Sequence, residues 1–344
     1  MDKKSIVLTG GGTAGHVMPN LALLPKLKEK FDNIYYIGEK GGVEERLAKE
    51  AGLDFYGITC VKFDRSRLLQ NYKIPSLLRK GVVESQRLLK MLSPSVVFAK
   101  GGYVSLPVTI SAKRAGVPYV LHESDITLGL ANKLVKNKAE LVFTSFEGTV
   151  KGELVSGNPV RREIFLGEAS KAPIFAENKN KLLFVGGSSG ATAINNFVVK
   201  VLPYLNDYNV IHLCGKNKSE QLKGIRSSSY LPLEYSSHIA DLYAWADVVV
   251  TRAGANALSE LLALGKKVIA IPLPKGGSRG DQSLNAEYYR LKGLIDVLPQ
   301  DALTVENFMA TLNSCMNKPK IKPLNNNAVD MISDELYKIA SRQK

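Results

Sequence analysis

The chain has 344 residues, which is enough for two domains of about 150 residues each. Apolar residues make up 45% of it and its glycine and proline contents are ordinary, as in globular proteins, while no run of about 18 apolar residues predicts a transmembrane helix. The formal net charge of +14 indicates an acidic partner: a phosphorylated substrate, an anionic membrane or nucleic acid.

The cysteines and the first residues bear on the cellular compartment. Cys60, Cys214 and Cys315 are too few and too scattered to indicate a disulfide framework or a zinc site. Met1–Lys4 leads into an apolar run that is too short for the core of a signal peptide. The sequence therefore predicts a cytoplasmic protein.

A glycine-rich loop follows the first predicted strand. Residues 5–9 form a short apolar run, typical of a buried strand in a parallel sheet, and the run stops at Gly10. The glycines up to Gly15 allow a tight turn, and Pro19, with leucines at helical spacing behind it, predicts the first turn of a helix. Such a loop is a site for an anion, most often a phosphate, because unpaired N–H groups and the helix dipole point at one spot.

This loop has three interpretations. Gly10, Gly12 and Gly15 match the dinucleotide fingerprint G-x-G-x-x-G, for which Glu39, after the second predicted strand, would be the ribose partner. The loop would also suit another phosphate ligand, or it could be a purely structural turn. His16 favours the second interpretation, because an imidazole beside a phosphate suggests proton transfer or phosphate binding, which a nicotinamide fingerprint does not require.

The rest of the first half alternates strands with helices, which is typical of a parallel α/β sheet. Four strand ends in a row are followed by glycine-rich or polar loops, among them Lys100–Pro107 and His122–Asp125. Because ligands of open α/β sheets bind at the carboxyl ends of the strands, we expect a binding site here. Strands are predicted at residues 34–38, 53–59, 94–99, 118–121 and 141–144, and helices at 44–49 and 130–135.

The pattern starts again in the second half. The first domain is expected to end at residues 157–161, and residues 166–180 form an exposed polar connection. A strand at 181–185 then leads into the glycine loop 186–191 and a helix from about residue 194. Two doubly wound domains, each with a phosphate-binding loop, indicate two phosphorylated ligands, a donor and an acceptor. Further strands are predicted at 210–213, 248–250 and 268–271, and a final amphipathic helix is predicted from Val329, Ile332, Leu336 and Ile339.

Seven motifs in this order resemble glycosyltransferase family 28. Its members include the bacterial enzymes that move N-acetylglucosamine (GlcNAc) from UDP-GlcNAc to undecaprenyl-pyrophosphoryl-MurNAc-pentapeptide (lipid I), which gives lipid II in peptidoglycan synthesis. Each motif is weak alone, but seven in the family's order, over nearly the whole chain, are specific. The motifs are Gly10–His16, Gly101–Ser105, His122–Glu123, Gly157–Arg161, Gly186–Ala191, Arg252–Glu260 and Gln282-x-x-Asn285.

The resemblance implies the GT-B fold: two Rossmann-like, doubly wound α/β domains facing across a cleft, with a C-terminal helix that returns to the first domain. Residues 1–160, with the helix at about 327–344, would bind the acceptor and the membrane, and residues 161–326 would bind UDP-GlcNAc. The resemblance further implies an inverting transferase with no cofactor and no catalytic metal, and the sequence contains no Asp-x-Asp. Helix dipoles and basic residues would then neutralise the departing UDP.

Carried over by position, the resemblance implies the residues of the donor site. Ser188, its neighbouring N–H groups and Arg161 would hold the donor diphosphate. Glu260 would accept hydrogen bonds from both ribose hydroxyls, and Gln282 would bind the hydroxyls of GlcNAc. The other donor contacts would be Thr13, Gly15, Asn158, Ser189, Gly190, Ala255, Asn256 and Asn285.

The resemblance places the acceptor on the first domain, where the loops at Gly11 and Gly101 would bind the diphosphate of the lipid. His16 is the first candidate for the general base that activates the MurNAc 4-hydroxyl, with Glu123 and Asp125 as the alternatives. The family usually has Gln-Asn after His-Glu; an ionised Asp125 here can accept hydrogen bonds but cannot donate them. The acceptor contacts would be Gly11, Gly12, His16, Gly101, Gly102, Tyr103 and His122.

Ordinary structural roles are open for several of these residues. Glu260 could be a solvated carboxylate on its helix, Arg161 could bridge the domains, and Tyr103 could pack on the glycine loop. His122 could be a buried orienting group. Of the residues outside the motifs, His212 and Trp245 are expected in the core, and His238 lies in a polar loop that could border the uracil.

Basic residues and leucines alternate between residues 62 and 90. Eight lysines and arginines stand there against Asp64 and Glu84, a net charge of +6. A solvated helix with a core-facing stripe would explain part of this pattern, but a basic rim around apolar residues is typical of a peripheral membrane site. We expect this stretch to dock on an anionic membrane, at the cytoplasmic face of the bacterial cell membrane, with other cell-wall synthesis proteins as further partners. The apolar residues include Leu68, Leu69, Leu77 and Leu78.

Three other functions compete with this one. A UDP-GlcNAc 2-epimerase has the same fold but no lipid acceptor. It would not need the loop Gly101–Tyr103 or the basic apolar stretch at residues 62–90. An NAD oxidoreductase is disfavoured by the glycine loop 186–191 of the second half, because an ordinary dehydrogenase has one such loop for one cofactor. A nucleic-acid binder would use the charge, but no recognition motif supports it, so nucleic acid is not expected as a partner.

Overall fold

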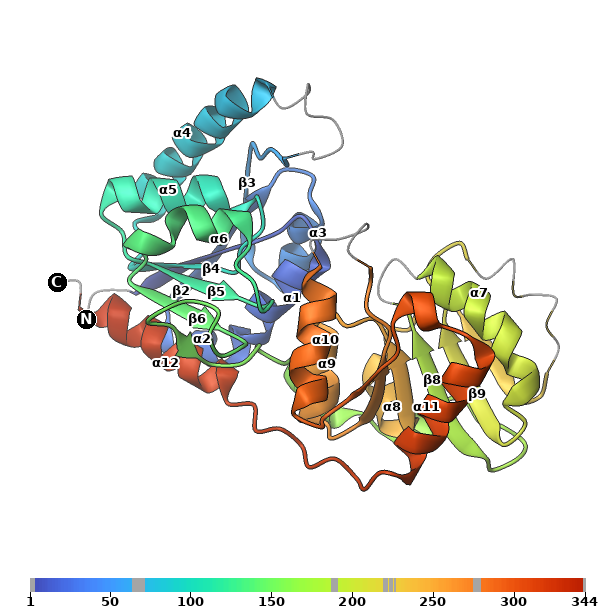
Figure 1. The fold of residues 1–344 in the computed structure, drawn as a ribbon. Helices are drawn as coiled ribbons and strands as arrows, with labels where there is room; N and C mark the ends of the chain where they lie inside the picture. Colours follow the sequence, from blue (N-terminus) through green and yellow to red (C-terminus); the bar gives the residue numbers. More distant parts are fainter. Residues whose placement is uncertain are drawn as a thin grey trace. The chain divides into compact units, whose positions relative to one another are not determined.

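The computed structural model describes residues 4–63, 72–186, 191–218, 222, 225, 227–274 and 280–342 (Figure 1). These residues form two compact units. Unit 1 comprises Met1–Arg161 and Asn326–Lys344, and unit 2 comprises Arg162–Asn325. Each unit contains a parallel sheet of its own, so the prediction of two Rossmann-like α/β sheets is confirmed.

Unit 1 is built on a parallel sheet of seven strands. They are β1 (Ser5–Thr9), β2 (Asn33–Glu39), β3 (Asp54–Ile58), β4 (Val96–Ala99), β5 (Tyr119–Glu123), β6 (Leu141–Thr144) and β7 (Leu154–Val155). Their order across the sheet is β3-β2-β1-β4-β5-β6-β7. Ile6 of β1 pairs with Ile34 on one side and with Val96 on the other, so the strand before the first glycine loop lies between two neighbours.

Helices cover both faces of this sheet, which explains why its strands are apolar on both sides. One layer consists of α1 (Ala14–Ala22), α2 (Leu24–Lys30), α3 (Val43–Glu50) and α12 (Ala328–Ser341), and the other of α4 (Ile74–Leu92), α5 (Ser105–Ala115) and α6 (Leu130–Val135). Ile6 and Leu8 pack in the core of the first layer, whereas Val7 packs in the core of the second. Figure 1 shows α4, α5 and α6 together on one side of the sheet, with α2 and α12 on the other.

The first helix begins earlier than the sequence predicted. Pro19 indicated a first helical turn, but α1 starts at Ala14 and Pro19 lies inside it. A proline inside a helix removes one backbone hydrogen bond, and α1 ends three residues later, at Ala22. The earlier start places His16 in the first turn of the helix rather than in the loop before it.

The last helix belongs to unit 1, as the resemblance implied. Ile332 and Leu336 of α12 are fully buried against the core that contains Ile6 and Leu8. Two aspartates on the same helix form ion pairs with lysines of α2. These pairs are exposed, so the buried side chains supply most of the stabilisation.

Unit 2 repeats the architecture with a parallel sheet of six strands. They are β8 (Asn180–Val185), β9 (Tyr208–Leu213), β10 (Tyr230–Leu233), β11 (Val248–Thr251), β12 (Lys267–Ala270) and β13 (Asp296–Val297), in the order β10-β9-β8-β11-β12-β13. Helices α7 (Thr192–Val201) and α11 (Val305–Asn317) cover one face, and α8 (Ile239–Trp245), α9 (Ala255–Ala263) and α10 (Asp281–Leu291) lie on the other (Figure 1). The segment before β8 contains two short 3-10 helices, Arg162–Leu166 and Ala169–Lys171, and its Ile174 is 94% exposed.

Both sheets have a topological switch point, where the order of the strands reverses. It lies between β1 and β4 in unit 1 and between β8 and β11 in unit 2. Ligands of open α/β sheets bind outside the carboxyl ends of the strands at such points. The glycine turns at residues 10–12 and 101–102 follow the two strands that flank the switch point of unit 1.

Replacing Leu336 by alanine tests the place of α12 in unit 1. Because this side chain is fully buried, we expect Leu336→Ala to lower the free energy of unfolding by about 2–5 kcal/mol. Urea denaturation followed by circular dichroism measures the change. Leu324→Ala is the matched control, because Leu324 is 38% exposed in the segment before α12 and should lose far less. Equal losses in the two variants would contradict the packing of α12.

Candidate functional site

Two glycine turns meet at the switch point of unit 1. Gly102, in the turn after β4, has a φ of +78°, and a Cβ on it would lie 2.5 Å from the carbonyl oxygen of Gly11. Gly12, in the turn after β1, has a φ of +80° and would place a Cβ 2.4 Å from the ring of Tyr103. The turns that the sequence predicted separately therefore touch, and a side chain at either glycine would separate them.

A buried carboxylate lies against the first turn. Glu44 of α3 is fully buried; its Oε2 accepts a hydrogen bond from the Gly12 N–H at 3.2 Å, and its Oε1 accepts one from the Glu39 N–H at 2.9 Å. The protein's own carboxylate thus occupies part of the anion site that the sequence predicted at the start of α1. Glycines leave the space for this side chain, since a Cβ would lie 2.4 to 2.9 Å from it at Gly11, Gly38 and Gly42.

These contacts disfavour the dinucleotide interpretation. Glu39, the required ribose partner, accepts a hydrogen bond from the Tyr103 hydroxyl at 2.6 Å. The Gly12 N–H, which would cradle a pyrophosphate, is bonded to Glu44. Burial, followed by the hydrogen bond to Glu39, raises the pKa of Tyr103, so its hydroxyl stays protonated and donates. Tyr103 therefore packs on the glycine loop and braces it.

His16 lies in the first turn of α1, just after the glycine turn at residues 10–12. The imidazole is half-buried, and its Nδ1 lies 3.0 Å from the Thr13 hydroxyl oxygen. Thr13 and Gly15, which precede His16 along the chain, are exposed. Because Nδ1 faces Thr13, Nε2 is the ring nitrogen on the edge away from that contact.

A buried lysine joins three strand ends near the second turn. Lys100 follows β4 and is 1% exposed; its Nζ lies 2.7 Å from Ser124 Oγ and 2.8 Å from Asn158 Oδ1, and it also contacts Nδ1 of His122. Nε2 of His122 lies 2.9 Å from the carbonyl oxygen of Gly157, so Nε2 carries the proton and Nδ1 accepts from the lysine. The three acceptors around Nζ match the three N–H groups of an ammonium.

The environment of this cluster shifts the pKa values of both basic groups. Burial lowers the pKa of Lys100 well below its usual range, while the negative charges of Glu123 and Asp125 raise it. Burial and the nearby Lys100 charge hold the pKa of His122 well below the usual range. His122 is therefore a neutral, buried group, and the geometry favours its orienting role over direct contact with an acceptor.

Glu123 closes the loop after β5. Its Oε1 accepts the N–H groups of Ser124 and Asp125 at 3.0 and 3.3 Å, and its Oε2 accepts the Gly129 N–H at 2.8 Å and an Asn132 side-chain N–H at 3.0 Å. Burial is the main cause that raises its pKa. With four donors on two oxygens, the geometry favours a structural role for Glu123. His16 and Asp125 are then the stronger candidates for a base.

Asn132 connects this loop to the second glycine turn. It is buried, and its side-chain N–H groups reach Glu123 Oε2 and the carbonyl oxygen of His122. A Cβ on Gly101 would lie 3.0 Å from its Nδ2. The residues predicted in unit 1 are therefore brought to one edge of the sheet.

The sequence missed Glu44, Lys100 and Asn132. Lys100 had a usable signal, because a lysine at the end of the apolar run 94–99 needs hydrogen-bond partners once it is buried. Glu44 and Asn132 had none, because each is polar within a helix and only the packing of that helix reveals its partner.

The predicted donor residues of unit 2 lie on α9 and α10. Ala255, Asn256 and Glu260 occupy the first two turns of α9, which begins shortly after β11. Ala255 is buried, whereas Asn256 and Glu260 are half-buried. Ser188, Ser189 and Gly190 lie outside the described residues.

Two side chains of α10 hold it against neighbouring loops. Asn285 is fully buried, and its Nδ2 donates to the carbonyl oxygen of Ala253 at 3.4 Å. Gln282 is half-buried, and its Oε1 accepts the Leu273 N–H at 3.0 Å. Asn285 therefore supports the start of α9, and Gln282 is the better placed of the two for contact with a ligand.

Arg252 braces the same edge of unit 2. Its Nη1 donates to the carbonyl oxygens of Ile271 and Pro272 at 3.1 and 3.3 Å, and its Nη2 donates to Gln300 Oε1 at 2.7 Å. These bonds hold together the segments that follow β11, β12 and β13.

Two residues expected in the core are found there. His212 is fully buried, with Nδ1 3.0 Å from the Tyr230 hydroxyl and Nε2 3.0 Å from Asn195 Oδ1. Burial lowers its pKa to about 4, so it is neutral near pH 7. Trp245 is 6% exposed and stacks on Phe175. His238, by contrast, is 79% exposed in its side chain.

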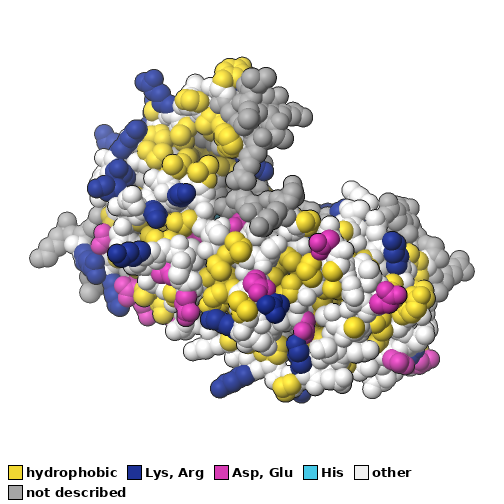
Figure 2. Space-filling view, in the orientation of Figure 1, with side chains coloured by type: hydrophobic (Ala, Val, Ile, Leu, Met, Phe, Trp, Pro, Cys, Tyr) yellow, Lys and Arg dark blue, Asp and Glu magenta, His cyan; other side chains and the backbone are white. Residues whose placement is uncertain are grey.

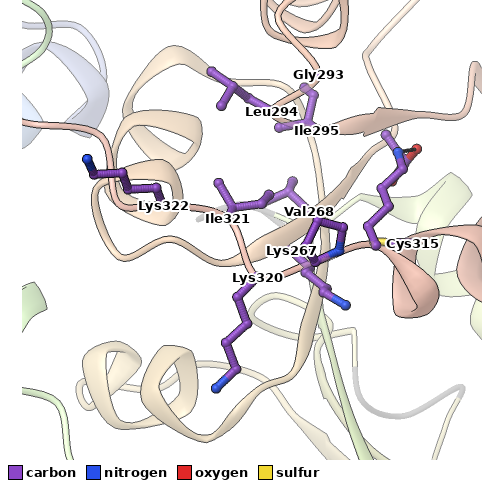
Figure 3. Close-up of a pocket in the computed structure, with 12 residues that line it drawn as sticks. Lys267, Val268, Gly293, Leu294, Ile295, Cys315, Lys320, Ile321 and Lys322 are labelled. Atoms are coloured by element: carbon purple, nitrogen blue, oxygen red, sulfur yellow. Dashed lines mark hydrogen bonds and ion pairs between the residues drawn. The ribbon is translucent and has the colours of Figure 1, made fainter.

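A pocket of about 240 Å³ in unit 2 is lined by none of the predicted donor residues that the structure describes (Figure 3). Lys267, at the first position of β12, marks this as the amino edge of the sheet. Its Nζ donates to the carbonyl oxygen of Met316 at 2.6 Å, and Lys318 pairs with Asp296. These lysines stabilise the carboxyl end of α11, so their charge has a structural explanation.

An exposed apolar and basic area, here called the α4–α6 surface, covers the second helix layer of unit 1. Tyr72, Met91 and Leu134 are 73%, 61% and 64% exposed, and Figure 2 shows apolar side chains here with lysines and arginines beside them. Leu77 and Leu78 are half-buried, and Leu68 and Leu69 lie outside the described residues. Among the helices that the structure describes, none has the length and apolar character needed to cross a membrane. The exposed basic residues of the α4–α6 surface include Lys73, Arg79, Lys80, Arg87, Lys90, Lys113, Arg114 and Lys133.

Comparison with protein families matches both halves of the chain. Residues 6–144 match the glycosyltransferase family 28 N-terminal domain, and residues 181–342 match the glycosyltransferase family 28 C-terminal domain. Two curated relatives carry the name UDP-N-acetylglucosamine–N-acetylmuramyl-(pentapeptide) pyrophosphoryl-undecaprenol N-acetylglucosamine transferase. The relative from Lachnospira eligens is 43% identical over 320 residues, 90% of each chain. The relative from Clostridium perfringens is 40% identical over 351 residues, 98% of this chain and 97% of its own.

Solved structures share the fold. MurG of Acinetobacter baumannii superposes with a TM-score of 0.76 at 24% identity, covering 97% of this chain and 99% of that chain. A UDP-N-acetylglucosamine 2-epimerase superposes with a TM-score of 0.64 at 13% identity, covering 99% of this chain and 98% of that chain. A transferase and an epimerase are thus both similar in fold, so fold alone does not separate these two functions.

Adding a methyl group at Gly102 tests the contact between the glycine turns. We expect Gly102→Ala to be destabilised both by the left-handed backbone, which costs about 1–2 kcal/mol, and by the clash with Gly11. Gly116→Ala is the matched control, because Gly116 has a φ of +70° but a Cβ there meets nothing within 4 Å. Urea denaturation of both variants should show a loss for Gly102→Ala that exceeds the control by about 1–3 kcal/mol. Equal losses would mean that the turns do not touch.

Proposed function

Because the chain belongs to glycosyltransferase family 28, we propose that it transfers GlcNAc from UDP-GlcNAc to the 4-hydroxyl of MurNAc in lipid I, giving lipid II for peptidoglycan synthesis. The observation that carries this proposal is the 40–43% identity, over nine-tenths or more of the chain, to transferases named for this reaction. The presence of one switch point in each sheet fits a reaction between two bound substrates.

The chemistry is an inverting displacement at the anomeric carbon of GlcNAc. The bond from the MurNAc 4-oxygen to that carbon forms as the bond from the carbon to the UDP oxygen breaks, and UDP leaves with the electron pair. A base takes the proton of the 4-hydroxyl. His16 is our first candidate, because it lies in the first turn of α1, just after the glycine turn, and Asp125 is the alternative.

Unit 2 would bind the donor. Glu260, half-buried in the second turn of α9, would accept hydrogen bonds from the ribose hydroxyls, and Gln282 would bind GlcNAc. Ser188 and Arg161 would hold the diphosphate, and Asn256 and Asn158 would be further donor contacts; of these, Arg161 and Asn158 belong to unit 1, and their donor roles are carried over from the family resemblance. Positive helix ends and arginine can neutralise the departing UDP, so we propose catalysis without a metal ion.

Unit 1 would bind the acceptor at its two glycine turns. The Gly12 N–H already donates a hydrogen bond to Glu44, so the turn at Gly101 and Gly102 is the better place for the acceptor diphosphate. Tyr103 would support this turn through its bond to Glu39.

The α4–α6 surface would attach the enzyme to the cytoplasmic face of the cell membrane, where its lipid substrate lies. Exposed Tyr72, Met91 and Leu134 would insert shallowly between the lipids, and the surrounding lysines and arginines would bind anionic headgroups. This attachment needs no membrane-spanning helix. Other cell-wall synthesis proteins are proposed as further partners.

Labelled UDP-GlcNAc, incubated with and without a soluble lipid I analogue, tests the proposed function. We expect label to move to the analogue, and we expect turnover to persist in EDTA. Conversion of UDP-GlcNAc to UDP-ManNAc without the analogue would instead identify an epimerase. Loss of turnover in EDTA with recovery in Mg²⁺ would contradict the metal-free mechanism.

Replacing His16 separates a base from a binding residue. A general base contributes about 10²–10⁴-fold in rate, so His16→Ala should lower kcat by about 10²-fold or more. The affinity for UDP, measured by calorimetry, should not change. The acid limb of the kcat profile, set by the imidazole, should disappear.

Asp125→Asn is the comparison for that experiment. If kcat falls in Asp125→Asn, while His16→Ala only raises the acceptor KM, Asp125 is the base and His16 a binding residue.

Reversing two charges tests the membrane site. We expect Arg79→Glu with Lys80→Glu to lower binding to phosphatidylglycerol vesicles more than tenfold, because each basic residue contributes about 1 kcal/mol at an anionic surface. The difference should shrink at high salt. Arg46→Glu with Lys49→Glu is the matched control, since these exposed residues lie on α3, in the other helix layer. Equal vesicle pelleting of both double variants would contradict the proposed surface.

A further inference from the structure

The buried Lys100 stands out because its ammonium group contacts three parts of unit 1, two of which also share a hydrogen bond from Ser124 Oγ to Asn158 Oδ1 at 3.2 Å. Its Nζ bonds Ser124 in the loop that carries Asp125, His122 at the end of β5, and Asn158 close to where the chain leaves unit 1. His122, Ser124 and Asn158 lie 22, 24 and 58 residues after Lys100 in the chain, so these contacts with Lys100 are not local ones.

Asn158 also binds the segment by which the chain comes back. Its carbonyl oxygen accepts a hydrogen bond from the side chain of Asn326 at 3.0 Å, and Asn326 is the first residue of the returning part of unit 1. The side chain of Asn158 faces Lys100 while its main chain faces Asn326. Lys100 and Asn158 together therefore connect the loop of a candidate base to the two segments by which the chain leaves unit 1 and returns to it.

Lys100 is itself fixed from the other side. Its main-chain N–H donates to the carbonyl oxygen of Thr9 at 2.9 Å, and its Cβ lies 3.0 Å from the place that a Cβ on Gly10 would take. The lysine stem thus lies against the first glycine turn. At 1% exposure the ammonium is closed off from solvent.

We propose that Lys100 is a positioning residue: its buried ammonium sets the Ser124–Asp125 loop against Asn158 beneath the glycine turns, in the arrangement that transfer requires. It acts through its three neighbours and does not touch the substrates. The proposal rests on the proposed function, since its effect is on the rate of GlcNAc transfer. A displacement of about 1 Å in such a support can cost about 10²-fold in rate.

Lys100→Met keeps most of the stem and removes the three N–H donors. We expect kcat with UDP-GlcNAc and a soluble lipid I analogue to fall about 10²-fold, while the calorimetric UDP affinity falls far less, because Asn158 is only one of several proposed donor contacts. Lys266→Met is the matched control, because Lys266 in unit 2 is a partly buried lysine whose Nζ donates to the carbonyl oxygens of Ala244 and Ala246. The control should lower Tm but leave kcat within twofold, with both variants measured well below their Tm.

Ser124→Ala removes one partner of Lys100, together with the hydrogen bond that Ser124 Oγ donates to Asn158 Oδ1 at 3.2 Å, and it serves as the second variant if Lys100→Met does not fold. It should lower kcat about fivefold to tenfold at unchanged UDP affinity, a factor in line with the loss of one hydrogen bond. In the double variant Lys100→Met with Ser124→Ala, the loss of kcat should be clearly smaller than the product of the two single losses, because both substitutions remove the Lys100–Ser124 bond.

Three outcomes would overturn the proposal: a kcat within twofold of wild type, a UDP affinity that falls as much as kcat, or losses that multiply in the double variant. Turnover by the wild-type protein is measured in the same series. If the wild type does not transfer GlcNAc, the proposed function fails, whereas a normal wild type with an unaffected Lys100→Met variant removes only the role of Lys100.

Discussion

The contact between the turns after β1 and β4 is the constraint on which the site in unit 1 depends. Gly102 can approach the carbonyl oxygen of Gly11 only because Gly102 has no side chain, and its left-handed φ turns the chain away again. Tyr103 then covers Gly12, and its hydroxyl reaches Glu39. The position of α1, and with it His16, follows from this contact, because the helix starts directly after the first turn.

Around this contact, charged side chains are buried without direct ion pairs between them. Glu44 is held by two main-chain N–H groups and Glu123 by three together with an amide side chain, while Lys100 has three neutral acceptors. A buried charge is tolerated when its hydrogen bonds are complete, and losing one partner is then costly. The hydrogen bonds of Glu44, Glu123 and Lys100 therefore hold the loops after the strands in one conformation. A reaction between two bound substrates needs such fixed geometry.

The fold and the function are supported by different observations. The two parallel sheets are similar both to a transferase and to a 2-epimerase among solved structures, so their topology is compatible with more than one reaction. The family membership separates the two, together with features that an epimerase would not need: a second glycine turn and the α4–α6 surface. The same unit 1 carries both features on separate elements, since the turn follows β4 and the surface covers the second helix layer.

The sequence by itself determined the strands, the glycine turns and the family. Short apolar runs, such as residues 5–9 before Gly10, are local signals, and they correctly predicted ten of the thirteen strands in the described residues, missing β7, β10 and β13. Local signals were weaker for helix starts: Pro19 indicated a start that lies inside α1, because a proline fits the first turn of a helix and is also tolerated further along it. Residues such as His212 could be assigned to the core because they lie within apolar strands.

Only the tertiary structure decided which candidate site residues touch and what surrounds them. In the structure the two glycine turns touch, the Tyr103 hydroxyl donates a hydrogen bond to Glu39, and the Gly12 N–H donates one to Glu44. The structure also showed that Lys100, 22 to 58 residues distant from its partners in sequence, is the centre of a buried cluster. Such pairings depend on the packing of whole helices and strands across the sheet, and no periodicity or spacing along the chain encodes them.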